Sequence, residues 1–281
     1  MKRLLLCVDG SRYAISCSQH AAWLASLFEA EIEVVYVTDL RQFEIPFVAD
    51  LGGSLGLQPY QAAMGQLKEL EERKATWIFE IVERTLRESG FDQRISTTHR
   101  IGFLVDSLRE LESRADLIVL GKRGENANYA TEHLGSMMER VARSTQLPCF
   151  IVSREYRKIG KVLLAVKSVK TSQKTLEFIS RNTGILELEI HVVSIASDNE
   201  EAEALKVLNY AEKTLKEAGC KAAFQMLHGF PSQTITGYVE RNGIDLIVMG
   251  ASAHSRIRHL ILGSTVMEIL KDCRLASLLV R

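Results

Sequence analysis

The sequence predicts an α/β protein built from two tandem halves, each a parallel sheet with helices on its faces. The first observation is an internal repeat: Asp116–Gly121 returns almost unchanged as Asp245–Gly250, and Leu134-Gly135-Ser136 returns as Leu262-Gly263-Ser264. The copies lie about 128 residues apart, much more than a solenoid period, so each copy should be a domain with its own core. The second observation is that strand-like apolar runs alternate with helix-like segments, which is typical of βαβ units with right-handed crossovers.

The first half begins with a continuous apolar run, as expected for a strand buried on both faces. Its longest helix is predicted by Ile78, Val82 and Leu86, which recur at i, i+4, and Gly90 is well placed to end it. The strands expected in this half are Leu4–Val8, Ile32–Val37, Arg94–Ile101, Leu117–Leu120 and Cys149–Val152. The expected helices are Ala14–Phe28, Glu69–Glu88, Val105–Arg114 and Ser136–Ser144.

The second half repeats this alternation. Its expected strands are Lys161–Val166, Glu189–Ser194, Ala222–Leu227, Leu246–Met249 and Ser277–Val280. Its expected helices are Thr171–Arg181, Glu200–Ala218, Gln233–Arg241 and Thr265–Lys271. We therefore expect domains at 1–153 and 160–281, packed together within the chain and joined by a short basic linker, Arg154–Gly160. The last strand of each half is an edge that could pair with the other half or with a second chain, which leaves a homodimer open.

The halves differ by an insertion at about residues 40–67, which is rich in glycine and proline and has no counterpart in the second half. A segment this long inside a compact domain is usually a lid, a binding loop or disordered. Its apolar residues argue against simple disorder. A functional loop and a structural flap over the other half both remain open.

Bulk composition excludes several functions. Lys+Arg and Asp+Glu are equal at 35 each, so no global field would attract nucleic acid or an anionic membrane. No run of about 18 apolar residues predicts a membrane span, and Asp9 interrupts the first apolar run too early for a signal peptide. The five cysteines include no CxxC pair and predict buried, reduced thiols in the cytoplasm. His254 and His259 fit a solvated basic loop better than a metal site, and no metal is expected.

The repeated segments carry the candidate chemistry. A glycine directly after an apolar strand, Gly121 or Gly250, allows a tight turn and the close approach of a ligand. Gly135-Ser136 and Gly263-Ser264 then open a helix, whose free N–H groups and positive dipole end favour an anion. These features predict a backbone cradle for phosphate, although neither a Walker loop nor a GxGxxG fingerprint is present. The alternative is that Ser136 and Ser264 are only helix N-caps.

Polar residues also follow the first strand, at Asp9-Gly10-Ser11. A carboxylate at this place can accept hydrogen bonds from ribose hydroxyls or a base amine. The alternative, compatible with the first, is that Asp9 caps the following helix or forms a turn. In the second half, Gly229–Ser232 is interpreted as a turn that faces the corresponding crevice.

In combination these motifs resemble the universal stress protein family. The resemblance rests on Val8–Ser11, on Gly121-x-x-Gly124 followed by Gly135-Ser136, and on the two tandem halves, and it covers essentially the whole chain. It implies an adenine-nucleotide-hydrolase-like fold in each half: a doubly wound, five-stranded parallel sheet with strand order 3-2-1-4-5. That order puts the topological switch point between the first and fourth strands, where a ligand crevice is expected. Many members of the family bind ATP or a related adenine nucleotide, and others do not.

The resemblance also implies roles for individual residues. Asp9 would contact the base and ribose, and the backbone of Val37 would meet the adenine. The remaining nucleotide-binding candidates of the first half are Gly10, Ser11, Gly121, Arg123, Gly124, Gly135, Ser136 and Met137. The second-site candidates are Gly250, Gly263, Ser264 and Thr265.

Each half departs from the family pattern. Ten residues separate Gly124 from Gly135, one more than the family has. Among them, Glu125 and Glu132 would repel a triphosphate, whereas Lys122 and Arg123, at the start of the loop, would attract it. In the second half Ala253 replaces a loop glycine and Lys167 replaces the aspartate, which should weaken ribose recognition. The second loop is basic instead and suits phosphate or another anion better than a nucleoside; its basic residues are His254, Arg256, Arg258 and His259. If one site works, we expect it to be the first.

We therefore expect a cytoplasmic stress-response module that senses ATP, ADP or AMP in its first half, with Mg²⁺ as a candidate companion of the phosphates. Hydrolysis would at most be slow, because the sequence offers no candidate base, acidic pair for Mg²⁺ or defined arginine finger. The alternative is a degenerate scaffold that binds a protein or an apolar ligand through the insertion and the domain interface. An ATP-dependent enzyme would need a nucleophile or metal constellation that the sequence does not show.

Overall fold

The computed structural model describes residues 1–39, 59–124, 135–197, 200–251 and 262–281. The strands of the first half are Arg3–Val8 (β1), Glu31–Asp39 (β2), Ile95–Gly102 (β3), Leu117–Gly121 (β4) and Cys149–Val152 (β5). Those of the second half are Lys161–Val166 (β6), Glu189–Ala196 (β7), Ala222–His228 (β8), Leu246–Gly250 (β9) and Ala276–Val280 (β10).

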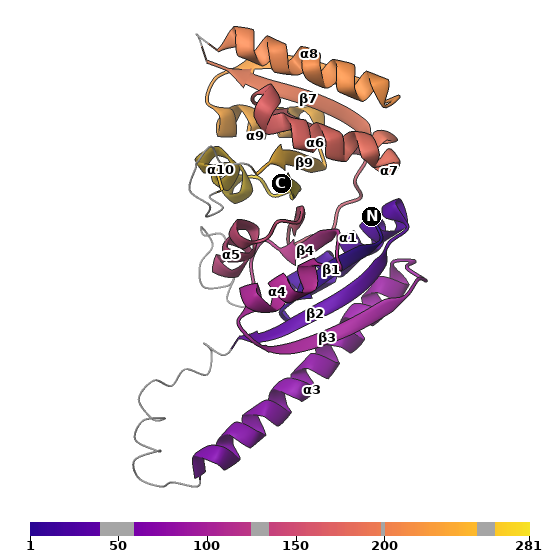
Figure 1. The fold of residues 1–281 in the computed structure, drawn as a ribbon, viewed down its shortest axis with the longest axis vertical. Helices are drawn as coiled ribbons and strands as arrows, with labels where there is room; N and C mark the ends of the chain where they lie inside the picture. The colour runs from indigo at the N-terminus through magenta and orange to yellow at the C-terminus, as the bar shows by residue number, and fades with distance from the viewer. Residues whose placement is uncertain (40–58, 125–134, 198–199, 252–261) are drawn as a thin grey trace.

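The strands form one sheet in the order β3-β2-β1-β4-β5-β10-β9-β6-β7-β8, which runs through both halves (Figure 1). Within each half the pairing is parallel and the order is 3-2-1-4-5, which confirms the predicted fold class. The two half-sheets join edge to edge through antiparallel pairing of β5 with β10, with Ser277 opposite Ile151. The edge strands therefore pair with each other within the chain.

Helices cover both faces of this sheet. The first half contributes Tyr13–Phe28 (α1), Pro59–Glu88 (α3), Leu104–Glu112 (α4) and Ser136–Ser144 (α5). The second half contributes Val169–Arg181 (α6), Thr183–Leu186 (α7), Glu201–Glu217 (α8), Pro231–Asn242 (α9) and Ser264–Asp272 (α10). One hydrophobic core lies under α1, α3, α6 and α8, and the other lies under α4, α5, α9 and α10, so each core runs through both halves.

The structure departs from the predicted elements at α3 and α7. Helix α3 begins at Pro59, ten residues before the predicted start, so residues 59–67 of the predicted insertion are helical. Proline is favoured in the first turn of a helix, and the Gln-Ala-Ala-Met that follows Tyr60 consists of good helix formers. The N-terminal part of α3 projects beyond the sheet (Figure 1), while residues 40–58 of the insertion lie outside the described residues. The short helix α7 was not predicted.

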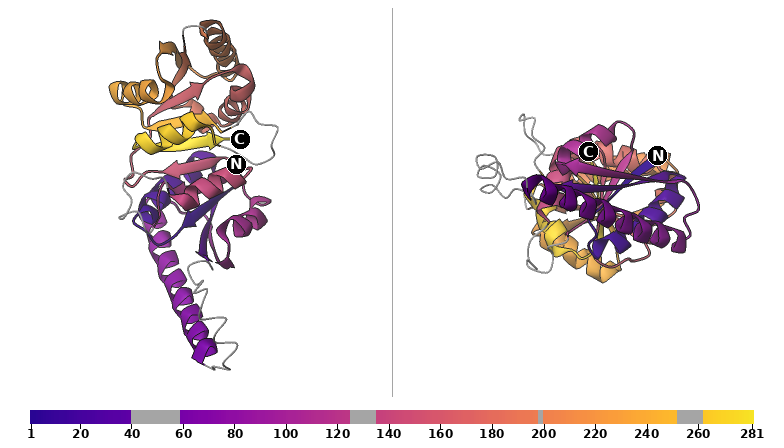
Figure 2. Two further views of the ribbon diagram at one scale, coloured as in Figure 1. Left: turned by 90° about the vertical axis from the view of Figure 1, so that its left-hand side faces the viewer. Right: turned by 90° about the horizontal axis from the view of Figure 1, so that it is seen from below.

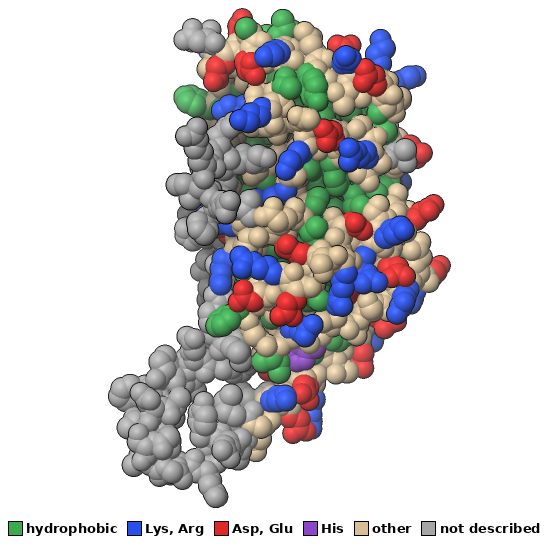
Figure 3. Space-filling model, viewed as in Figure 1, with side chains coloured by type: hydrophobic (Ala, Val, Ile, Leu, Met, Phe, Trp, Pro, Cys, Tyr) green, Lys and Arg blue, Asp and Glu red, His purple; other side chains and the backbone are tan. Residues whose placement is uncertain are grey.

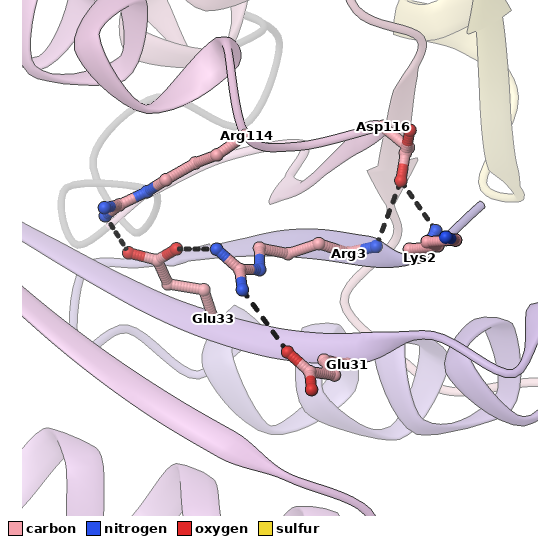
Figure 4. Close-up of polar contacts among 6 residues, drawn as sticks. All are labelled: Lys2, Arg3, Glu31, Glu33, Arg114 and Asp116. Carbon is pink, nitrogen blue, oxygen red and sulfur yellow. Dashed lines mark hydrogen bonds and ion pairs between the residues drawn. The ribbon is translucent and has the colours of Figure 1, made fainter.

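The aspartate that opens the repeated hexapeptide has a structural role. Oδ2 of Asp116 accepts hydrogen bonds from the backbone N–H groups of Lys2 (2.6 Å) and Arg3 (3.0 Å), as Figure 4 shows. Oδ2 of Asp245 accepts the equivalent bonds from Gly160 and Lys161, both at 2.9 Å. In each half the carboxylate fixes the start of the central strand, which explains why this residue recurs.

An ion-pair network around the buried carboxylate of Glu33 lies next to Asp116. Glu33 is 3% exposed, and its Oε1 accepts hydrogen bonds from Arg114 Nη2 (2.6 Å) and Thr98 Oγ1 (2.7 Å). Arg3 lies 3.9 Å from the other oxygen of Glu33 and 3.3 Å from Glu31 (Figure 4). A buried carboxylate requires such partners, because an uncompensated charge in the sheet would strongly destabilise it.

The outer surface is mixed in charge. Acidic and basic side chains are interspersed on the face seen in Figure 3. Within the described part of the chain, every helix is too short or too polar to cross a bilayer. The two halves stack along the long axis and both chain ends lie at the seam between them (Figure 2).

Buried His20 makes stability depend on pH. Its Nδ1 donates to the Ser16 carbonyl at 2.8 Å, and its ring contacts Phe150 and Tyr156. Burial lowers the pKa of His20 to about 4. The unfolded chain therefore binds more protons than the folded protein between pH 6.5 and 4, so stability is retained above pH 6.5 and falls as the pH drops through this window.

We expect His20→Leu to reduce the loss of unfolding free energy between pH 7 and pH 4 by about 2 to 3 kcal/mol relative to the unaltered protein. Urea denaturation at a series of pH values measures this difference. Substitution of the exposed His228 by Asn is the control and should leave the pH dependence unchanged. Parallel curves for the His20 variant and the unaltered protein would contradict the assignment.

Candidate functional site

The carboxyl ends of β1 and β4 lie side by side, with Cys7 paired to Leu120, and a pocket opens just beyond them. Its cavity volume is about 80 Å³. Six of the nucleotide-binding candidates line it: Asp9, Val37, Gly121, Arg123, Gly124 and Met137. The structure thus places these six at the topological switch point, where open α/β sheets bind ligands.

The Asp9 loop forms a turn that leads into helix α1. Oδ1 of Asp9 accepts a hydrogen bond from the Ser11 N–H at 3.0 Å, and Ser11 Oγ accepts one from the Tyr13 N–H at 3.2 Å. The alternative is thus confirmed in part: Asp9 forms the turn, and Ser11 provides the side-chain acceptor at the start of α1, whose N-cap position is Arg12. Gly10 has φ +76°, a left-handed conformation that a side chain would strain. This turn holds Asp9 at the pocket.

Glycines bring the strand β4 loop against Asp9. A Cβ on Gly124 would lie 2.5 Å from Oδ2 of Asp9, which is closer than a carbon and an oxygen can approach. A Cβ on Gly121 would lie 2.8 Å from the Cβ of Tyr13 and 3.0 Å from the Arg123 carbonyl oxygen. The two predicted motifs therefore meet. A side chain at Gly121 would displace Tyr13 or the Arg123 backbone, and one at Gly124 would push the Asp9 carboxylate aside.

The start of α5 lies next to this loop. Gly135, which is the N-cap of α5, donates its N–H to the Lys122 carbonyl at 3.1 Å. Gly263 is likewise the N-cap of α10, so the alternative that Ser136 and Ser264 are N-caps is wrong. Both serines are the first helical residues, and N–H groups in a first turn have no intrahelical acceptor. Backbone donors at Ser136 and Met137 are thus available where an anion would be held.

Lys122 does not contribute its charge to the pocket, contrary to what the sequence suggested. Its side chain is 7% exposed and its Nζ donates to the carbonyl oxygen of Cys273 in the second half. Burial lowers the pKa of Lys122 to about 8. Arg123 does line the pocket.

The residues near the pocket that were not predicted from the sequence include Tyr13 and Arg154. Tyr13 lines the pocket, and burial raises the pKa of this phenol while the charges of Arg123 and Arg154 oppose the rise. Arg154 belongs to the linker, whose basic composition was the available signal. Two arginines thus lie close enough to Tyr13 to place positive potential at the pocket.

The thiols at the pocket are poor nucleophiles. Cys7 and Cys17 both line it, and burial raises the pKa of each thiol well above its usual value. The thiolate is the reactive form of cysteine, so both are inert at neutral pH. Among the described residues, no three His, Cys, Asp or Glu side chains gather as metal ligands.

The second half keeps the glycine at the end of its fourth strand, Gly250, but has no counterpart of the Asp9 carboxylate. A Cβ on Gly250 would lie 2.8 Å from the Thr171 carbonyl oxygen, so this glycine lets strand β9 pack on α6 much as Gly121 packs on α1. Lys167 occupies the place of Asp9, and its N–H donates to Ser172 Oγ at 3.3 Å. A Cβ on Gly263 would meet no described atom within 4 Å. Ser264 and Thr265 begin α10, whereas the basic loop, 252–261, lies outside the described residues, as do Glu125 and Glu132.

We expect Gly121→Ala to lower the unfolding free energy by about 1 to 3 kcal/mol, because the added methyl overlaps Tyr13. The matched variant Gly263→Ala should stay within about 1 kcal/mol of the unaltered protein, since its methyl would meet no described atom within 4 Å. Thermal or urea denaturation measures both. Equal effects at the two positions would contradict the close packing assigned to Gly121.

Comparisons with known proteins agree with this architecture. A model of the universal stress protein family matches residues 1–153 and again 158–281. The universal stress protein Slr1230 of Synechocystis sp. is 39% identical over 278 residues, which cover 96% of each chain. The crystal structure of a universal stress protein from Archaeoglobus fulgidus superposes with a TM-score of 0.72 at 18% identity, covering 99% of this chain and 98% of that one. A functionally unknown protein from Pseudomonas aeruginosa has a TM-score of 0.64 at 16% identity, covering 100% and 92%. The chain therefore belongs to the universal stress protein family.

Proposed function

We propose that the first half binds an adenine nucleotide at the switch point between β1 and β4, and that the protein acts as a nucleotide sensor in a stress response. The observation that carries this proposal is the single pocket into which Asp9, Val37, Gly121, Arg123, Gly124 and Met137 converge. We take 1–153 and 160–281 as the two domains and the cytoplasm as the place of action.

The chemistry of the pocket suits each part of a nucleotide. Apolar side chains, among them Leu104, Leu120 and Val141, provide a surface for a base. The carboxylate of Asp9 can accept hydrogen bonds from a ribose or a base amine. The N-terminal amides of α5 and the charge of Arg123 can hold phosphate.

The size of the pocket limits how the ligand would lie. Its volume of about 80 Å³ is well below the roughly 300–1,000 Å³ of sites that engulf a ligand. We infer that only part of the nucleotide enters the pocket, and that the phosphates lie along the Gly121–Gly124 backbone toward the start of α5. Any Mg²⁺ would be held chiefly by the phosphates, because this cation favours phosphate and water ligands.

The proposed output is a conformational or oligomeric change. Fast phosphoryl transfer needs a positioned base or water and charge stabilisation in line with the leaving group. The pocket offers protonated thiols, a phenol with a raised pKa and one carboxylate already engaged in a turn. We therefore expect hydrolysis to be slow at most, which a phosphate-release assay measures.

We expect the purified protein to bind ATP, ADP or AMP, and Asp9→Ala to weaken that binding by about tenfold or more, because a charge-assisted hydrogen bond is lost. Isothermal titration measures the affinity, and absorbance with chromatography detects any nucleotide that copurifies. Substitution of the exposed Asp92 by Ala is the matched control. If the unaltered protein binds no adenine nucleotide at millimolar concentration, the proposal fails and the scaffold alternative takes its place.

A second prediction concerns stoichiometry. We expect one nucleotide per chain, because Lys167 stands where the second half would need its aspartate. Gly263→Val should leave this stoichiometry unchanged. Gly135→Val should abolish binding, since even a Cβ added at this position would lie 3.1 Å from the Arg123 Cα. Titration of both variants measures this. Two nucleotides per chain, falling to one in Gly263→Val, would show that the second half binds.

A further inference from the structure

The loop of the candidate site lies at the seam between the two halves. Lys122 follows strand β4, and Cys273 shortly precedes strand β10. Because β10 runs antiparallel to β5, its first residues lie beside the last residues of β5, with Ser277 opposite Ile151. The start of β10 therefore comes close to the carboxyl ends of β4 and β5.

Lys122 crosses this seam. Its Nζ donates to the carbonyl oxygen of Cys273, which is the C-cap residue of α10. A helix C-terminus carries a negative partial charge, so an ammonium group is well matched to it. Cys273 is itself fixed, because its thiol lies 3.3 Å from Thr236 Oγ1 on helix α9. The lysine thus holds a fixed point of the second half.

The backbone of the same lysine holds the first half. Its N–H donates to the Val152 carbonyl at 2.8 Å, and its carbonyl accepts the Gly135 N–H at 3.1 Å. The main chain of Lys122 therefore joins β5 to the start of α5, while its side chain joins the end of α10.

The equivalent position in the second half lacks this link. Ala251 donates its N–H to Val280 at 2.8 Å, just as Lys122 does to Val152. Its methyl group cannot reach across the seam to hydrogen-bond the end of α5. The link is therefore made once, from the loop that keeps the aspartate and both early glycines.

We propose that Lys122 is a positioning residue that makes the Gly121–Gly124 loop and helix α10 one mechanical unit, so that a ligand bound at the loop is sensed in the second half. The nature of this ligand rests on the proposed function, but the mechanical link does not. Linkage makes this coupling reciprocal: if a ligand at the loop changes the affinity of an effector that binds and shifts α10, the effector changes the affinity of that ligand by the same factor. The second half is then a reporter of the first site.

The test compares Lys122→Met, which keeps the aliphatic stem, with the control Lys221→Met, which removes an exposed ammonium group next to β8 at the far edge of the sheet. Hydrogen exchange without nucleotide is measured first. We expect Lys122→Met to accelerate amide exchange about tenfold in the last turn of α10 and in the first turn of α5, and the control to leave both unchanged. Exchange equal to that of the unaltered protein at both places would overturn the proposal.

Nucleotide is then added. We expect α10 to gain protection in the unaltered protein and in Lys221→Met, and to gain none in Lys122→Met, whose affinity should fall by about five- to tenfold. Protection of α10 in Lys122→Met would also overturn the proposal. If no adenine nucleotide binds the unaltered protein, the proposed function fails, while the first experiment still decides the role of Lys122.

A second pair of variants covers the case in which Lys122→Met does not fold. Lys122→Arg keeps a cationic donor and should preserve slow exchange in α10, whereas the shorter, neutral Lys122→Gln should not. Equal exchange in these two variants would count against the proposal.

Discussion

The antiparallel pairing of β5 with β10 is the contact on which the rest of the structure depends. A parallel five-stranded sheet leaves two edges, and an exposed edge invites pairing with other chains. Here each half covers one edge of the other, and both hydrophobic cores continue across the seam. Phe150 and Leu278 lie in one core, and Ile151 and Leu279 in the other. The pairing thus turns two similar domains into one body.

The same pairing brings the second half into contact with the loop of the first candidate site. Because the strands run in opposite directions at the seam, the end of α10 lies beside the loop after β4, where Lys122 reaches it. A cation that sequence reasoning would assign to phosphate is used instead to join the halves. The loop keeps Arg123 for the pocket. The end of α10 in the second half therefore has a structural role next to the candidate site of the first half.

Close backbone approach defines the first site more than charge does. Gly121 and Gly124 allow the loop to touch Tyr13 and Asp9, and Gly135 allows α5 to begin beside Arg123. Gly263 has no comparable neighbour among the described atoms, although the sequence motif around it is the same.

The fold class and most helices and strands could be predicted from the sequence to within a few residues, because buried strands and amphipathic helices leave periodic apolar patterns. The strand order followed from the family resemblance. The sequence also identified six of the residues that line the pocket, through the family resemblance and because parallel strands bring the loops after them to one edge. It could not determine where α3 begins, because a helix that projects beyond the sheet has no core-facing pattern there. Only the tertiary structure decided that the edge strands pair within the chain and that Lys122 points to Cys273. Both outcomes depend on which surfaces of the two halves come into contact. Local sequence patterns do not record contacts between residues far apart in the chain, such as Lys122 and Cys273, which are 151 positions apart.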